Sequence, residues 1–154
     1  MNYQRLWKWI IAIVVIVLIV IFVSWKGSNK PVVTGERQTV IVGVSLPLTG
    51  DVAMLGQSAK NAILLAQEQL PKNLKYDYKL VFEDDQFKPA LGATVANKLI
   101  NIDNADALVS FGSPVGSVIS PIAEKAQILH VNDFASASQV ADGDYNFVHY
   151  TPPL

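Results

Sequence analysis

After residue 38 the chain alternates between continuous apolar runs and segments with helical spacing. Residues 39–48 read TVIVGVSLPL, a β-branched run typical of a strand that is buried on both faces. The same reasoning places further strands within residues 76–84, 105–112, 127–132 and 145–153. Helices are expected between them, at residues 57–70, 88–101 and 115–126. Such alternation with short loops predicts an α/β fold in which helices cover both faces of a parallel sheet.

The N-terminal segment has a different character. Residues 9–25 read WIIAIVVIVLIVIFVSW, preceded by Arg5 and Lys8. Aromatic flanks and an unbroken apolar run favour a transmembrane helix. We expect residues 1–25 to be an uncleaved membrane anchor, with a cleaved signal sequence as the alternative, because no small-residue cleavage site precedes Trp25. Residues 26–38 read as a linker, so residues 39–154 form the expected domain, outside the membrane.

Composition excludes several function classes. The 154 residues contain no cysteine, which excludes disulfides, thiolate metal sites and cysteine nucleophiles. The formal net charge is −1 and no basic stripe is present, so nucleic acid is not an expected partner. Neither GSPVGS, at residues 112–117, nor the first strand carries a phosphate-loop or dinucleotide fingerprint. We expect no cofactor and no metal.

The turn after the third expected strand is the first candidate site. Ser113 and Pro114 follow a buried run and lead into a helix, whose first N–H groups lack intrahelical acceptors. The loop at residues 132–138, NDFASAS, would place Ser136 at the neighbouring strand end. Together they could receive a carboxylate without a formal positive charge. From local chemistry alone, helix capping by Ser113 and Ser136 is the favoured alternative.

Other polar residues are assigned structural roles. Glu83, Asp84 and Asp85 end the second strand, and we expect one of them to cap the following helix while the others stay solvated. A metal or acid–base pair is the alternative. His130 and His149 lie in apolar strands without triad partners, so both are interpreted as structural and no catalytic residue is predicted.

Three segments, taken in order, resemble a known family. They are IVGVSLPLTGDVAMLGQSAKNAILLA, LVFEDDQFKPALGATVANKLI and ALVSFGSPVGSVISPIAEKAQILHVNDFASAS. This order and spacing are similar to the N-terminal part of type I periplasmic binding proteins, in the branch that binds leucine, isoleucine and valine. The resemblance implies a two-lobed, non-enzymatic receptor that delivers a branched-chain amino acid or small amide to an ABC permease.

The resemblance also implies roles for individual residues. Ser113, with Pro114 in the same turn, occupies the position that binds the ligand carboxylate. Phe134, Ala135 and Ser136 occupy the loop that meets the ammonium and carboxylate groups. Leu55, in the first loop, would form part of the wall around the ligand's apolar side chain, or pack locally.

The chain also departs from the pattern. Phe134 is bulkier than the usual residue and would narrow the pocket, and Asp133 adds a charge. Relatives are more than twice as long, so we expect only the first lobe here, with weak ligand binding on its own. Two alternatives remain, namely the ligand-sensing domain of a signalling receptor and a flavodoxin-like enzyme.

Overall fold

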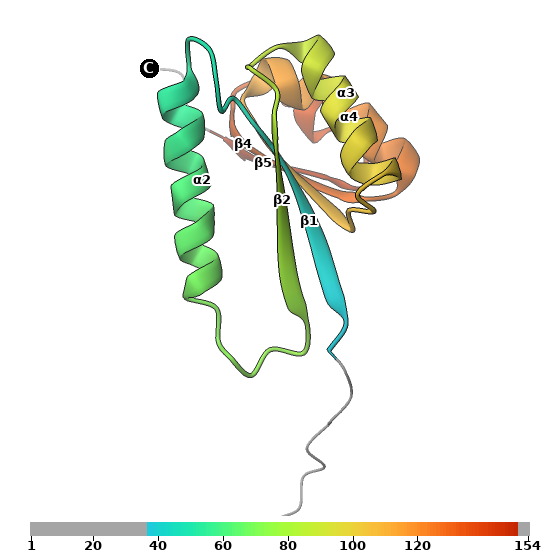
Figure 1. Ribbon diagram of the computed structural model, residues 1–154. Helices are drawn as coiled ribbons and strands as arrows, with labels where there is room; N and C mark the ends of the chain where they lie inside the picture. The colour runs from blue at the N-terminus through green and yellow to red at the C-terminus, as the bar shows by residue number, and fades with distance from the viewer. Residues whose placement is uncertain (1–36, 151–154) are drawn as a thin grey trace, which may run out of the picture. The chain divides into compact units, whose positions relative to one another are not determined.

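The computed structural model describes residues 37–150, which form one five-stranded sheet with helices on both faces (Figure 1). The strands are β1 (Thr39–Leu46), β2 (Asp77–Asp84), β3 (Ala107–Phe111), β4 (Leu129–Ala135) and β5 (Asn146–Tyr150). The helices are α2 (Ala53–Glu68), α3 (Pro89–Asn101), α4 (Ser113–Ala126) and a short 3₁₀ turn, η1 (Ser138–Ala141). The parallel α/β architecture predicted from the sequence is confirmed.

The strand order is β2-β1-β3-β4-β5, and every neighbouring pair is parallel. Strand β2 therefore lies on one side of β1, and the chain then crosses past β1 and adds β3, β4 and β5 on the other side. The helices that follow β1 and β3 consequently lie on opposite faces, α2 on one and α4 with α3 on the other (Figure 1). This is the switch point in strand order at which open parallel sheets form a ligand crevice.

The larger core lies between the sheet and helices α3 and α4. Its centre consists of Leu99, Leu108, Val115 and Ile119, each at most 2% exposed. Helices α3 and α4 approach closely at Gly92, where an added Cβ would lie 2.8 Å from Val115 Cγ1. The apolar periodicity of the sequence thus produces a tightly packed layer on this face.

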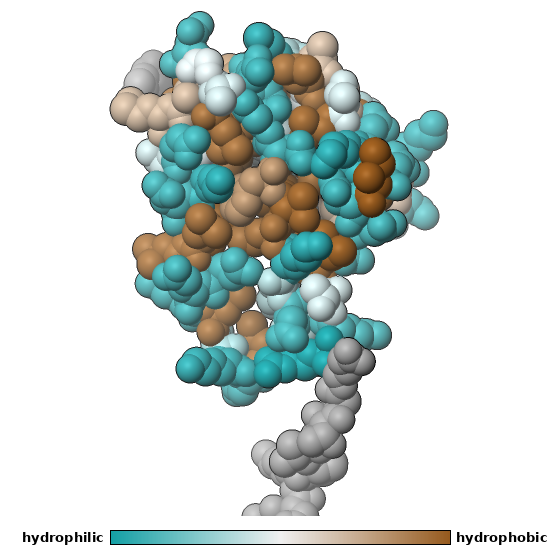
Figure 2. Space-filling model, in the orientation of Figure 1, coloured by the Kyte–Doolittle hydropathy of each residue, from teal (hydrophilic) through white to brown (hydrophobic). Residues whose placement is uncertain are grey.

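Within the part of the chain that the structure describes, the opposite face is covered only near α2. One cross-sheet row runs in register from Val44 through Val109 and Val131 to Phe147. Exposure rises along this row from 0% at Val44 to 37% at Val131 and 58% at Phe147. Figure 2 shows apolar side chains gathered where α2 faces β1 and β2 in Figure 1. Helix α2 therefore shields one end of the sheet and leaves apolar side chains of β4 and β5 in solvent.

Several expected boundaries shift. Helix α2 begins at Ala53, four residues before the predicted start, and α4 begins at Ser113 and runs through Pro121. The predicted membrane anchor lies outside the described residues. Among residues 37–150 themselves, none of the helices combines the length and hydrophobicity that a membrane span requires.

Candidate functional site at the strand ends

The carboxyl ends of the strands meet at one edge of the sheet. Leu46 of β1 pairs with Asp84 of β2, and Phe111 of β3 pairs with Asp133 of β4. The four loops that follow these strands therefore lie along this edge, which we call the strand-end crevice. Two different sets of polar groups fix these loops.

Ser113 joins the turn after β3 to the loop after β4. Its Oγ accepts hydrogen bonds from the backbone N–H of Ser136, at 3.0 Å, and of Ala137, at 3.2 Å. With both amides donating to it, the Ser113 hydroxyl keeps its own hydrogen to donate elsewhere. The N–H groups of Ser113 and Val115, in the first helical turn, lack intrahelical acceptors. The two turns predicted to meet are thus brought together around uncharged donors.

The capping alternative for these serines is wrong. The N-cap residue of α4 is Gly112, with φ of 78°, and no side chain caps this helix. Ser136 likewise caps nothing, because the N-cap of η1 is Ala137 and it has no side-chain cap bond. Ser113 is the first helical residue, and its oxygen stabilises a second loop instead.

A buried polar network lies beneath these two turns. Its side chains belong to Ser110, His130, Asn132 and Asn146, which are at most 7% exposed. His130 Nε2 lies 2.7 Å from Ser110 Oγ, and His130 Nδ1 lies 2.8 Å from Asn146 Oδ1. Because an amide oxygen only accepts, His130 donates through Nδ1 and accepts the Ser110 hydroxyl at Nε2.

The network reaches the Gly112–Ser113 turn through Asn132. Its Nδ2 donates to Ser110 Oγ at 2.6 Å and to the carbonyl oxygen of Gly112 at 3.2 Å. Burial lowers the pKa of His130, although the hydrogen bond with Asn146 acts in the opposite direction. The imidazole is therefore neutral at physiological pH, in keeping with the structural role predicted for it.

Two carboxylates fix the loops after β1 and β2. Asp84 accepts hydrogen bonds from the N–H groups of Leu48, Thr49 and Gln86, at 2.8 to 3.2 Å. Asp85 is fully buried and accepts the Phe87 N–H at 2.7 Å and the Ser45 hydroxyl at 2.6 Å. The prediction that one of these residues caps the next helix is wrong, since Lys88 is the N-cap of α3 and has no side-chain cap bond.

The two carboxylates respond to this environment in opposite directions. Burial raises the pKa of Asp85, and its hydrogen bonds to Ser45 and Phe87 offset only part of the increase. Burial would also raise the pKa of Asp84. Hydrogen bonds to its carboxylate, of which the one from Thr49 has the largest effect, outweigh burial and lower this pKa.

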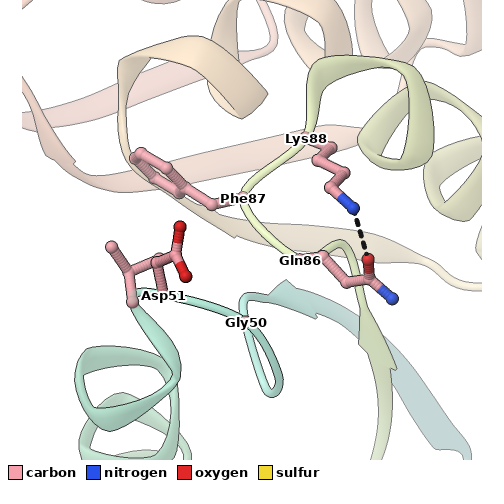
Figure 3. A pocket seen from close by; sticks show the side chains of 6 residues that line it. Gly50, Asp51, Gln86, Phe87 and Lys88 are labelled. Carbon is pink, nitrogen blue, oxygen red and sulfur yellow. Dashed lines mark hydrogen bonds between the residues drawn. The ribbon is translucent and has the colours of Figure 1, made fainter.

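A hollow of about 390 Å³ opens between the loops after β1 and β2 (Figure 3). Its lining residues are Gly50, Asp51, Val52, Gln86, Phe87 and Lys88. Lys88 Nζ donates to Gln86 Oε1 at 2.8 Å on one side, and the Phe87 ring stands on the other. The sequence did not single out Phe87, because no motif marks it; only the tertiary fold brings its ring here.

Three phenylalanine rings from three strand ends lie in a row, which we call the phenylalanine row. The rings of Phe87 and Phe111 have centroids 6.3 Å apart and are tilted by 55°. Those of Phe111 and Phe134 are stacked, 5.2 Å apart and 3° from parallel. Phe111 is 7% exposed, whereas Phe134 is 52% exposed. The row thus presents an open aromatic ring at the edge of the crevice.

The remaining predicted site residues are placed differently. Pro114 is exposed beside Ser113, while the Ala135 side chain is fully buried, so only its backbone is available to a ligand. Leu55 lies in the first turn of α2 rather than in a loop, is 43% exposed, and does not line the hollow. Within residues 37–150 no group of three His, Asp or Glu side chains could hold a metal ion.

This crevice is built on a chain segment with a clear family signature. Residues 39–153 match the family model described as periplasmic binding protein. The chain belongs to the periplasmic binding protein family. The predicted resemblance is therefore confirmed, and the family is one of solute-binding receptors rather than enzymes.

Solved structures share the fold. A leucine-binding protein, LivK from Thermotoga maritima, is 27% identical, with a TM-score of 0.65 over 71% of this chain and 31% of its own. LivJ from Streptococcus pneumoniae, solved with isoleucine, is 20% identical, with a TM-score of 0.67 over 72% of this chain and 33% of its own.

A third structure carries a different ligand. It is an ABC transporter solute-binding protein from Rhodopseudomonas palustris in complex with 3,4-dihydroxybenzoic acid, 23% identical, with a TM-score of 0.65 over 71% of this chain and 31% of its own. The chain spans about a third of the length of each of these structures. No curated protein matches it.

Proposed function

We propose that this chain forms the first lobe of an extracytoplasmic solute receptor for an ABC importer. The receptor binds a small carboxylate-bearing solute without changing it covalently and presents it to a membrane permease. The branched-chain amino acids are the first candidate ligands, and the N-terminal apolar segment would tether the domain to the membrane. Family membership and the ABC transporter proteins among the structural neighbours support this proposal.

One observation carries the proposal. Ser113 opens helix α4 at the strand-order switch, holds the loop after β4 through two backbone amides, and retains a hydroxyl hydrogen to donate. Free N–H groups and the helix dipole add partial positive charge at the same point. Isoleucine and dihydroxybenzoate, the ligands of two structural neighbours, share a carboxylate, and such a group fits this turn.

The test is ligand binding by the full chain, kept in mild detergent because of its apolar N-terminal run. NMR shift titration suits the weak affinity expected of one lobe. Ser113→Ala should weaken binding of isoleucine by about 1–3 kcal/mol, because the carboxylate loses a hydrogen bond and the loop loses its acceptor. Ser113→Thr, which keeps a hydroxyl, should recover part of the loss.

Ser58→Ala is the matched control. Ser58 Oγ donates to the carbonyl of Met54 at 2.8 Å on the exposed side of α2, away from the turn. Its substitution should leave the affinity unchanged. An unchanged dissociation constant for Ser113→Ala would remove Ser113 from the site.

A further inference from the structure

We propose that the phenylalanine row selects an aromatic carboxylate over an aliphatic amino acid. The inference rests on the proposed function, because it concerns the ligand of the same crevice. Its basis is the position of three rings, from Phe87, Phe111 and Phe134, beside the Gly112–Ser113 turn. A flat π-surface next to an uncharged anion receptor matches a ligand that has one aromatic ring and one carboxylate.

The row is in direct contact with the turn. A Cβ added to Gly112 would lie 2.5 Å from Cε2 of Phe87, so the Phe87 ring covers the backbone immediately before Ser113. Phe111 is two residues before Ser113, and Phe134 is two residues before Ser136, whose amide donates to Ser113. A carboxylate held at Ser113 would thus have aromatic surface within reach of its attached group.

Two of the three phenylalanines occupy a backbone conformation that bulky residues avoid. Phe87 has φ of 59° and Phe134 has φ of 60°, in the left-handed region that favours glycine. A nearby carboxylate holds each of them. Asp85 accepts the Phe87 N–H at 2.7 Å, and Asp133 accepts the Phe134 N–H at 2.9 Å. Bulky side chains retained in strained positions at a crevice are typical of functional sites.

The exposed end of the row also needs an explanation. Phe134 places a large ring in solvent, where a glycine would avoid both the strain and the exposure. An aromatic ligand would gain a stacked or edge-on partner there, which contributes beyond simple burial. An aliphatic side chain would gain only the burial.

The carboxylates around these turns also bear on the identity of the ligand. Asp84 and Asp85 already accept hydrogen bonds from protein donors, and Asp133 Oδ1 lies 2.7 Å from His149 Nδ1. Asp84 and Asp85 are therefore engaged with protein donors, whereas Asp133 is 55% exposed and accepts the Phe134 N–H through Oδ1. An aromatic acid needs no carboxylate partner, since it needs only the anion receptor and a flat wall.

The experiment compares benzoate, cyclohexanecarboxylate and isoleucine on the full chain by NMR shift titration. Benzoate and cyclohexanecarboxylate have the same carboxylate and a similar size, so their difference isolates the aromatic ring. Benzoate should bind more tightly than both. Phe134→Leu should weaken benzoate binding about 2- to 10-fold and leave cyclohexanecarboxylate nearly unchanged. Phe147→Leu is the control, because Phe147 is 58% exposed on the same sheet face but outside the row.

The outcomes separate this inference from the function on which it rests. Binding of isoleucine without a preference for benzoate overturns the inference and leaves the proposed function standing. Equal loss of benzoate affinity in Phe134→Leu and Phe147→Leu also overturns it, because the effect would then be general. If none of the three carboxylates binds, the proposed function fails and the inference fails with it.

Discussion

The two halves of the strand-end crevice are fixed by different chemistry. At β1 and β2, the carboxyl groups of Asp84 and Asp85 accept hydrogen bonds from backbone N–H groups of the loops. At β3 and β4, a buried network of neutral groups centred on His130 supports the turn, and Ser113 ties two loops together. The first arrangement tolerates solvent at Asp84, whereas the second is enclosed, so the two halves should differ in sensitivity to substitution and to pH.

The largest expected effect is at the enclosed half. His130→Leu leaves the Ser110 hydroxyl and the side-chain amide oxygen of Asn146 without their partner, in a site that water does not reach. The free energy of unfolding should fall by about 2–4 kcal/mol, measured by urea denaturation. His149→Leu is the control, because that side chain is 77% exposed, and it should change stability by less than about 0.5 kcal/mol. A cost for His130→Leu as small as the control's would mean that the network is not structural.

A smaller effect is expected at the carboxylate half. Asp84→Ala removes the acceptor of three loop amides, but the site is only partly buried and water can replace the carboxylate. We expect a loss of about 1–2 kcal/mol in the same urea experiment. Asp51→Ala, at an exposed residue of the same hollow, should be nearly neutral. If Asp84→Ala lowers the free energy of unfolding by more than His130→Leu does, burial does not decide which half is more sensitive to substitution.

The smallest effect is a pH response whose sign differs between the halves. The pKa of His130 is lowered by folding, so the unfolded chain takes up a proton first and stability falls as the pH drops through about 6.5. The pKa of Asp85 is raised above its ordinary 3.8, so the folded chain takes up the proton first, and stability rises as the pH falls through that raised pKa.

This response can be separated by substitution. Between about pH 7.5 and about pH 5.5, His130→Gln should reduce the loss of stability, while Asp85→Asn should leave most of that loss in place. His149→Gln is the control in the same experiment, because His149 is the other histidine of the chain. The same slope in wild type and His130→Gln would assign the response to other groups.

The sequence predicted the sheet better than the site. Continuous β-branched runs such as residues 39–48 identify buried parallel strands, and helical periodicity identifies the helices that cover them. Both patterns follow from burial alone. The meeting of Ser113 and Ser136 was also predicted, since parallel strands end at one edge. These expectations needed only periodicity and topology.

The missed features depend on tertiary contacts. Gln86 and Phe87 both adopt left-handed backbone conformations without being glycine, so no residue type marked that loop. Asp85 appeared to be one of several solvated acids, yet Ser45 from β1 makes its burial possible. Helix α2 starts four residues before the predicted start, and its N-cap, Val52, makes no side-chain cap bond that a sequence motif could reveal.

The cross-sheet row that ends at Phe147 has a practical consequence for handling the protein. The exposed residues of this row, Val131 and Phe147, lie on β4 and β5. In the described sheet, β5 is the last strand, and its outer backbone groups have no neighbouring strand. Apolar surface next to an open strand edge promotes self-association. Titrations at high protein concentration would then report clustering as well as ligand, so dilution series belong in every affinity measurement on this lobe.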